Sequence, residues 1–320
     1  MDSAIVQFGI VGAGRIARNR IAPAMKAARG VRLYAAASRE IERAKGLGPV
    51  RAYASYGDLM RDPSVDAVFI TTHNGLHREL TLEALANGKH VLCEKPLARN
   101  ASECEEVLIA ARAAGRHMVE AFMYRYHPQI DRVQELVGGG AVGEVVSVEA
   151  SFRFHLGRDH DVRLNPQWGG GSLLDVGCYC VNATRLFLGN EPTYVQGRAR
   201  FDRPHGVDIS FQAILEYASG CSATISCGFD GGLYQKLAVV GTKGSLSLNA
   251  PFVARASTPR LTLQSEQGEE VTEMDTVNPY QMEIEDLARA IVNGARPKLT
   301  PEEGLLNARV LDRLAADARP

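Results

Sequence analysis

The sequence lacks the features that would place its chemistry on a metal, in a membrane or in an oxidising compartment. Its six cysteines show neither C-x-x-C spacing nor a cluster with histidine, which argues against a zinc site and favours reduced, mostly buried thiols. No apolar segment is long enough to span a bilayer, and no basic leader precedes the first apolar run. We therefore expect a cytoplasmic protein that needs no metal.

Neither sign of charge is in excess. The 36 Lys and Arg residues balance the 37 Asp and Glu residues, and the formal net charge is -1. The chain as a whole therefore has no field that would attract nucleic acid or an anionic membrane, and a bound phosphate group needs a local site. What the chain does have is 45% hydrophobic residues over 320 positions, enough for a substantial core and two domains.

The chain begins with an apolar strand, residues 4–11, that runs directly into a glycine motif. The motif is G-x-G-x-x-A, in which the glycines allow a tight turn and a close approach of the backbone to a pyrophosphate at a helix N-terminus. A chance glycine turn is the alternative, but a strand precedes the motif and a helical pattern follows it. Pro23 is expected to break or kink that helix. The predicted cofactor-binding residues here are Gly12, Ala13, Gly14, Arg15 and Ile16.

The second strand, residues 31–37, ends on Ser38 and Arg39. A free ribose 2′-hydroxyl is usually held at this point by a carboxylate, whereas a 2′-phosphate needs a cation and hydrogen-bond donors. Ser38 and Arg39 therefore favour NADP over NAD. In the alternative interpretation, Arg39 stacks on the adenine ring and tolerates both cofactors.

Polar residues follow the third predicted strand, residues 66–71. Because the carboxyl ends of parallel strands line the cofactor cleft, Thr71, Asn74 and His77 are candidates for contacts with the ribose and the pyrophosphate. Each of them could instead cap a helix.

The apolar run that begins at Val91 stops abruptly on Glu94, Lys95 and Pro96. Such an ending is typical of the carboxyl end of a buried strand, where a rigid element would present Glu94 and Lys95 to a bound molecule. The alternative is a solvated strand end.

Strands alternate with helical patterns up to about residue 121, which predicts a doubly wound parallel sheet and an α/β fold. Beyond that point the chain changes to long alternating segments separated by hairpin turns, which predict a large open, mostly antiparallel sheet with helices on one face. We therefore predict a dinucleotide-binding Rossmann domain over residues 1–121 and a substrate-binding and oligomerisation domain over residues 122–320. Because an open sheet face is usually covered, we expect a homodimer or higher homo-oligomer. The predicted strands of the second domain are residues 144–154, 193–201, 208–217, 221–229, 233–240 and 245–248.

One stretch of the second half does not resemble ordinary scaffold. Three glycines, residues 169–171, precede a helical pattern in which Asp175 and Tyr179 lie four residues apart and so share one face. A carboxylate and a phenol on one face could engage a polyol. A phenol has a reference pKa of about 10, and a nearby ammonium such as that of Lys95 would lower it toward the working range. The alternative is a tyrosine packed in the core with its hydroxyl bonded to Asp175.

Four motifs together resemble the glucose–fructose oxidoreductase/inositol dehydrogenase (Gfo/Idh/MocA) family, over essentially the whole chain. They are the glycine motif, Glu94-Lys95-Pro96-Leu97, the sequence EAFMYRYHP at residues 120–128, and the three glycines followed by DVGCY at residues 175–179. Tyr179 is similar to the branch that holds D-xylose (pyranose) dehydrogenases and dimeric dihydrodiol dehydrogenase, whereas inositol dehydrogenases typically carry histidine there. Members of the similar branch usually use NADP, in agreement with Ser38 and Arg39.

The resemblance implies a role for each site residue. Lys95 and Tyr179 would flank the reacting carbon, with Tyr179 exchanging the hydroxyl proton and Lys95 polarising the oxygen, while Asp175 would orient the substrate. Arg125 and His127, just after the change from one domain to the other, would lie in the cleft, with Arg125 at the cofactor; the alternative is a basic helix start. Hydride transfer is the chemistry of the nicotinamide, so the protein need only position the partners and tune one proton transfer. For an aldose the reaction would be oxidation at C1 to the lactone.

Other functions remain open. The same Lys-Tyr pair could reduce a keto sugar or a diketone, or oxidise a trans-dihydrodiol. Some proteins of this architecture are non-catalytic dinucleotide sensors, but the presence of both Lys95 and Tyr179 argues against that function here. Contacts to the distal substrate hydroxyls are expected from the loop at residues 154–168 and from the sheet near residues 229–234.

Overall fold

The computed structural model of the chain describes residues 4–157, 160–189, 191–253 and 258–318. The chain divides into two compact units, of which the first comprises the chain up to Met123 together with Asn278–Leu305. The second comprises Tyr124–Val277 and the chain from Leu306 onward. Residues 278–305, which the sequence placed in the second domain, therefore belong to the first unit.

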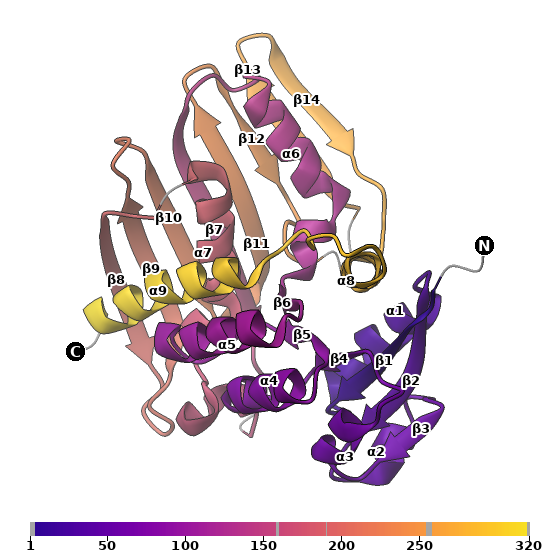
Figure 1. The fold of residues 1–320 in the computed structure, drawn as a ribbon. Helices are drawn as coiled ribbons and strands as arrows, with labels where there is room; N and C mark the ends of the chain where they lie inside the picture. The colour runs from indigo at the N-terminus through magenta and orange to yellow at the C-terminus, as the bar shows by residue number, and fades with distance from the viewer. Residues whose placement is uncertain (1–3, 158–159, 190, 254–257, 319–320) are drawn as a thin grey trace. The chain divides into compact units, whose positions relative to one another are not determined.

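The first unit is built on a six-stranded parallel sheet with the order β3-β2-β1-β4-β5-β6 (Figure 1). Successive strands run outward on both sides of β1 and β4, so the strand order reverses between these two neighbours. Ligands of such sheets bind at the carboxyl ends of the strands around this point. The strands are β1 (Val6–Val11), β2 (Val31–Ala37), β3 (Arg51–Tyr53), β4 (Ala67–Ile70), β5 (His90–Glu94) and β6 (Met118–Ala121).

The helices of the first unit cover this sheet. The helix does not break at Pro23, since the π-helical turn η1 runs directly into α1 with helical backbone at Ile21 and Ala22. The π-helical turn lies directly before Pro23, and a kink there stays a prediction. Helix α8 packs against α1, β1, β2 and β5 through its buried face, which explains why it belongs to this unit. The helical elements are η1 (Ala17–Ile21), α1 (Ala22–Ala27), α2 (Ile41–Lys45), α3 (Tyr56–Arg61), η2 (Asn74–Leu76), α4 (His77–Ala86), α5 (Ala101–Ala114) and α8 (Pro279–Asn293).

The second unit contains an eight-stranded sheet with the order β14-β13-β12-β11-β7-β10-β9-β8 (Figure 1). Its neighbours pair antiparallel, apart from the parallel pair β7 and β10, so the predicted mostly antiparallel sheet is confirmed. The sequence did not predict β13 and β14. The strands are β7 (Val145–His155), β8 (Tyr194–Phe201), β9 (Asp208–Glu216), β10 (Ser222–Gly228), β11 (Asp230–Gly241), β12 (Gly244–Leu248), β13 (Arg260–Ser265) and β14 (Gly268–Glu273).

Helix α7 packs against β7 and β10, the two central parallel strands. Along β7, Val148, Ala150 and Phe152 are buried, while the alternate residues are more exposed. This period of two is the signal that predicted the strand.

Among the described residues, none of the helices has the length and apolar character that a membrane crossing requires. The remaining helical elements are η3 (Met123–Tyr126), α6 (Pro128–Gly138), η4 (Val162–Leu164), η5 (Pro166–Trp168), η6 (Leu173–Gly177), α7 (Cys178–Leu188) and α9 (Pro301–Asp317), whose residues fall on both sides of the division.

Candidate active site

The glycine motif forms a tight turn at the carboxyl end of β1. Gly12 has a φ of 101°, and a Cβ there would lie 3.1 Å from Thr72 Cγ2 and 3.3 Å from the Thr71 carbonyl. A Cβ on Gly14 would have no described heavy atom within 4 Å. Gly12 is therefore needed for the fold of the turn, whereas Gly14 leaves the space that a pyrophosphate would require. Of the other predicted residues, Ala13 is buried, Ile16 is half-buried and Arg15 is exposed.

Thr71 locks this turn to the neighbouring strand β4. Its hydroxyl donates to the Gly12 carbonyl at 2.6 Å, and the side chain is buried. The sequence assigned Thr71 to the cofactor; the structure shows it bonded to the loop that would carry the pyrophosphate, and a direct contact stays a prediction.

Ser38 and Arg39 follow the carboxyl end of β2. The Ser38 hydroxyl accepts from the Glu40 backbone N–H at 3.3 Å. The Arg39 side chain is exposed and forms no ion pair with any described residue. Burial, together with the positive charge of Arg39, lowers the pKa of His73, so this cation acts at the edge of the sheet where β4 also ends. Arg39 is thus available for an anionic group.

His77 is fully buried between two carbonyl groups. Its Nδ1 lies 2.8 Å from the Pro96 oxygen and its Nε2 lies 3.2 Å from the Thr72 oxygen. Burial lowers the pKa of His77 to about 4, so the ring is neutral and donates through one nitrogen only. The ring lies between the loop after β4 and the turn that contains Lys95, and its single N–H donates to one of the two carbonyl oxygens. Asn74, also predicted at the cofactor, is half-buried at the start of η2.

The turn after β5 is held on a second side by β6. Glu94 and Lys95 are half-buried, and the Lys95–Pro96 peptide is cis. The Leu97 backbone N–H donates to Glu120 Oε1 at 2.8 Å, and the Glu120 side chain is buried. The sequence did not single out Glu120 as a support of Lys95, because only the pairing of β5 with β6 brings them together.

In the second unit, Asp175 forms an ion pair with Arg163. Arg163 Nε lies 2.6 Å from Asp175 Oδ2, and its Nη1 lies 3.1 Å from Asp161 Oδ1. The Asp175 carboxylate is the main cause that raises the pKa of Arg163 above its ordinary value. Sequence reasoning missed Arg163, which lies in the predicted substrate loop at residues 154–168; residues 158 and 159 of that loop lie outside the described part of the chain.

Tyr179 lies in an aromatic cluster and is only 6% exposed. Its ring centroid is 5.5 Å from that of Phe152, 5.5 Å from that of Phe252 and 5.8 Å from that of Tyr124. Packing on three sides fixes the ring, so the position of the phenol oxygen is set by the core of the unit.

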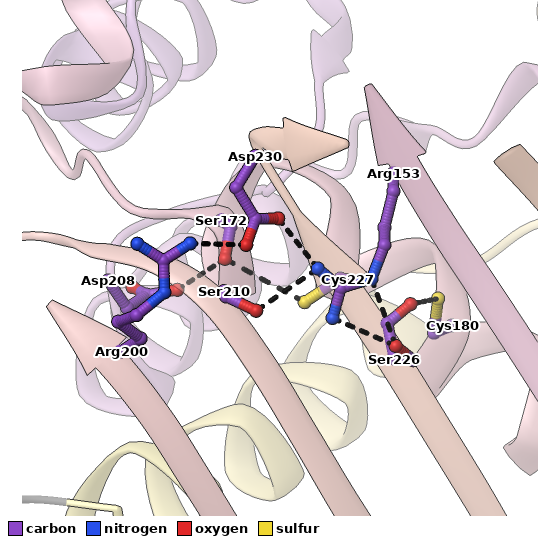
Figure 2. A network of polar contacts seen from close by, with 9 residues as sticks. All are labelled: Arg153, Ser172, Cys180, Arg200, Asp208, Ser210, Ser226, Cys227 and Asp230. Atoms are coloured by element: carbon purple, nitrogen blue, oxygen red, sulfur yellow. Dashed lines mark hydrogen bonds and ion pairs between the residues drawn. The ribbon is translucent and has the colours of Figure 1, made fainter. Parts of the chain in front are cut away.

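The segment that carries Asp175 and Tyr179 is anchored to the sheet at two points (Figure 2). Asp208 Oδ2 accepts from the Ser172 hydroxyl and from the Leu173 backbone N–H, each at 2.7 Å. Farther along, Cys180 Sγ lies 4.0 Å from the Ser226 carbonyl. Between these anchors the backbone forms the π-helical turn η6, so Asp175 sits in a wider turn than the α-helix that the sequence predicted.

Two buried side chains of the segment before α6 keep unused hydrogen-bonding atoms. Arg125 Nη1 donates to Asn182 Oδ1 at 3.3 Å, but its Nε has no partner among the described residues. His127 Nδ1 accepts from the Gln129 backbone N–H at 3.2 Å, and its Nε2 is likewise without a described partner. A buried guanidinium bonded to a neutral amide keeps an uncompensated charge, so an anionic or polar ligand fits this place.

The similarity to known proteins extends over the whole chain. It is 40% identical to a D-xylose 1-dehydrogenase (NADP(+)) of Haloferax volcanii, over 98% of this chain and 97% of that protein. Residues 6–122 match an oxidoreductase family with an NAD-binding Rossmann fold, and residues 130–247 match the Gfo/Idh/MocA C-terminal domain. This protein belongs to the Gfo/Idh/MocA oxidoreductase family.

Other Gfo/Idh/MocA relatives differ in their chemistry. The chain is 35% identical to a trans-1,2-dihydrobenzene-1,2-diol dehydrogenase of Xenopus laevis, over 76% of this chain and 74% of that protein. The structure of a 3-ketoreductase from Actinomadura kijaniata, in complex with NADP and TDP-benzene, superposes with a TM-score of 0.93 at 30% identity, over 98% of each chain. These relatives share the oxidoreductase class and differ in substrate.

Each unit of this Gfo/Idh/MocA protein gathers its own share of the predicted residues. In the first unit, the glycine motif and the polar residues after β2, β4 and β5 all follow the carboxyl ends of parallel strands, which lie at one edge of a sheet. In the second unit, Arg125 contacts Asn182 of α7, the helix that carries Tyr179. Among the described residues, no group of three His, Cys, Asp or Glu side chains could hold a metal ion.

Proposed function

We propose that this protein is an NADP-preferring sugar dehydrogenase that oxidises an aldose of the D-xylose or D-glucose type at C1 to the lactone. The observation that carries the proposal is the 40% identity to a D-xylose 1-dehydrogenase (NADP(+)) over 98% of this chain. The presence of Lys95, Asp175 and Tyr179 supports it, since these are the groups that the resemblance assigns to the reaction.

The proposed division of labour follows from the chemistry of the side chains. Bound NADP supplies the hydride acceptor. Tyr179 takes the proton of the C1 hydroxyl, and Lys95 stabilises the negative charge that develops on the same oxygen. Asp175, which is paired with Arg163, accepts a hydrogen bond from the sugar and orients it.

We propose that the dinucleotide binds along the carboxyl edge of the parallel sheet. Backbone N–H groups at Gly12–Ile16 would take the pyrophosphate, and Ser38 and Arg39 would take the 2′-phosphate of NADP. Thr71, Asn74, His77 and Glu94 would support the pyrophosphate and nicotinamide halves, largely by holding the two loops in place. Arg125, whose Nε has no partner among the described residues, would add a donor for the cofactor.

Reduced-nicotinamide absorbance tests the function directly. Purified protein is mixed with NADP or NAD and with D-xylose, D-glucose, inositols and trans-dihydrodiols. Formation of NADPH with an aldose supports the proposal. Oxidation of a dihydrodiol alone would indicate a trans-dihydrodiol dehydrogenase instead. Consumption of NADPH with keto sugars or diketones alone would indicate a reductase. Bound cofactor without any change in absorbance would indicate a non-catalytic dinucleotide sensor.

Two substitutions test the Lys-Tyr pair. Lys95→Ala and Tyr179→Phe should each lower kcat by about 100-fold or more, because each removes a proton-transfer or charge-stabilising group, while cofactor affinity changes little. Tyr56→Phe, at a half-buried tyrosine of α3 to which no role is assigned, is the matched control and should keep full activity. Undiminished turnover of either site variant contradicts the role assigned to that residue.

Arg39→Asp tests cofactor choice. Loss of the cation and gain of a carboxylate should raise the KM for NADP far more than the KM for NAD, since only NADP carries the 2′-phosphate. Equal changes in the two KM values would show that Arg39 only stacks on the adenine ring.

We also propose that copies of the chain associate through the eight-stranded sheet. Tyr194, Ile214, Tyr234 and Val271 are each about half exposed, and the strand register places them on one face. Analytical ultracentrifugation tests this, and a monomer at all concentrations would refute it.

A cytoplasmic location remains a prediction that cell fractionation can check.

A further inference from the structure

One glutamate of the first unit buries a carboxyl group that forms no hydrogen bond with any described residue. Glu283, on α8, has an exposed fraction of 0%, and neither of its carboxyl oxygens has a partner among the described residues. A carboxylate in such a place would lose its hydration without compensation, whereas a protonated carboxyl group loses far less. Burial therefore favours the neutral acid.

Other carboxyl groups on α8 or on the elements around it are not fully exposed: those of Glu285 and Asp286 on the helix, and one on a strand. Asp286, three residues along the helix, accepts from the Lys298 backbone N–H at 2.7 Å. Helix α8 packs against η1, α1, β1, β2 and β5, and β5 ends on Glu94. Burial raises the pKa of Glu283 well above its ordinary value, and the charge of Glu94 raises it further. His90 lies at the other end of β5, and the remaining charged side chains of these elements are exposed; they are Arg18, Arg20, Lys26 and Arg32.

Glu94 directly precedes Lys95, in a turn whose backbone is fixed from two sides. The His77 ring contacts the Pro96 carbonyl at 2.8 Å, and Glu120 accepts from the Leu97 N–H at 2.8 Å. These contacts fix the backbone on which the Lys95 side chain is carried, directly after Glu94. In a site of low dielectric, a change of charge alters the electrostatic energy of another charge a few ångströms away more strongly than it would in water.

We propose that Glu283 is a positioning residue that acts on Lys95 through Glu94. It keeps its proton in the working enzyme, so that Glu94 alone of the two carboxyl groups carries negative charge beside the Lys95 ammonium. Ionisation of Glu283 would place a second negative charge behind Lys95 and weaken the field that stabilises charge on the substrate oxygen. This inference rests on the proposed function, in which Lys95 carries that role.

The test is the pH dependence of kcat, measured from about pH 6 to about pH 10 with saturating NADP and sugar, for the wild type and three variants. Glu283→Gln has the size of the protonated acid and cannot ionise; Glu283→Met is similar in volume, has no ionisable group and serves as the second variant should Gln disturb folding. Glu285→Gln is the matched control, because Glu285 lies on the same helix and binds Arg29 instead.

At neutral pH, Glu283→Gln should keep kcat within about threefold of the wild type, because both side chains are then neutral. On the alkaline side, the fall in kcat should move to higher pH by about one unit or more in the Gln and Met variants, but not in Glu285→Gln. If Glu283 were only structural, its substitution would lower kcat or stability without moving the pH at which kcat falls on the alkaline side.

Coincident profiles of the wild type and Glu283→Gln would overturn the inference, as would a uniform loss of kcat with an unshifted alkaline limb. Two further results separate this failure from the others. If the wild type forms NADPH with an aldose, Lys95→Ala loses turnover and the profiles coincide, only the role of Glu283 is wrong. If Lys95→Ala keeps full turnover, the role assigned to Lys95 is wrong and that of Glu283 with it, whereas a wild type that forms no NADPH with any aldose contradicts the proposed function itself.

Discussion

Substitution of Glu283 by glutamine should change how the stability of the protein depends on pH. The pKa of Glu283 is raised in the folded state by burial and by Glu94, whereas in the unfolded chain it should be near the reference value of about 4.3. A raised folded-state pKa contributes stability that is fully present below the unfolded pKa. That stability is lost as the pH rises toward the folded pKa. The wild type should therefore lose stability relative to Glu283→Gln as the pH increases.

The magnitude follows from one proton. While Glu283 is protonated in the folded state and ionised in the unfolded state, the free energy of unfolding changes by about 1.4 kcal/mol per pH unit. Between about pH 5.5 and pH 7.5 the difference between the wild type and Glu283→Gln should change by up to about 2.7 kcal/mol. For a unit of this size the corresponding shift in the difference between the two Tm values is about 5–10 °C.

Calorimetric unfolding of the two cofactor-free proteins across this pH range is the assay. Every other titratable group is present in both proteins, so the difference between the unfolding free energies of the wild type and Glu283→Gln reports on Glu283 alone. Glu285→Gln is the control, because the pKa of Glu285 is shifted in the opposite direction. Burial raises this pKa, but the hydrogen bonds from Gln281 and Arg29 lower it by more, so the pKa of Glu285 is lowered on balance. The stability that Glu285 contributes is lost only as the pH falls through its lowered pKa, so this control should be flat from pH 5.5 upward. A wild-type to Glu283→Gln difference that is constant with pH would refute the argument.

Two further substitutions test the supports of the substrate segment. Asp208→Ala should destabilise the protein by about 2–5 kcal/mol, because the Ser172 hydroxyl and a buried backbone N–H lose their acceptor. Asp208→Asn keeps an acceptor and should change the free energy of unfolding by about 1 kcal/mol or less. Equal losses of unfolding free energy in the two variants, measured by chemical denaturation, would contradict this. Gly170→Ala should cost about 1–3 kcal/mol and lower activity, because its Cβ would lie 2.5 Å from the Arg163 carbonyl, which is backbone and cannot yield. Gly138→Ala, in open space on a helix, is its control and should stabilise by about 0.5–1 kcal/mol; similar Tm values for the two variants would refute the clash.

The fold was largely predictable because its elements are locally patterned. Buried parallel strands are continuous apolar runs, and the half-buried strands of the second sheet alternate with a period of two. Strand β14 was missed for the converse reason, because its sequence GEEVTE is exposed throughout and only its pairing with β13 makes it a strand. Strand β13 was missed although its sequence, RLTLQS, alternates with a period of two. The return of α8 to the first unit was missed as well, because chain order gives no signal for where a terminal helix packs.

The site was predictable where a short motif carries the chemistry. The glycine motif and Lys95 could be read from a few consecutive residues that end a strand. Their neighbours could not be read in the same way, since Glu120 meets the turn after Lys95 through strand pairing and Arg163 meets Asp175 from a loop. Glu283, which is proposed to act on Lys95, lies on a helix whose packing the sequence did not predict.

Glu283 shows why residues outside the reacting groups matter. Packing alone does not call for a carboxyl group at this position, because glutamine fills the same volume and never pays the stability penalty that an ionisable group incurs as the pH rises. The carboxyl group differs from glutamine in only one relevant respect, which is that its charge can change. If that change occurs behind Lys95, it couples turnover to pH through a group that never touches the substrate, and the penalty in stability has a functional explanation.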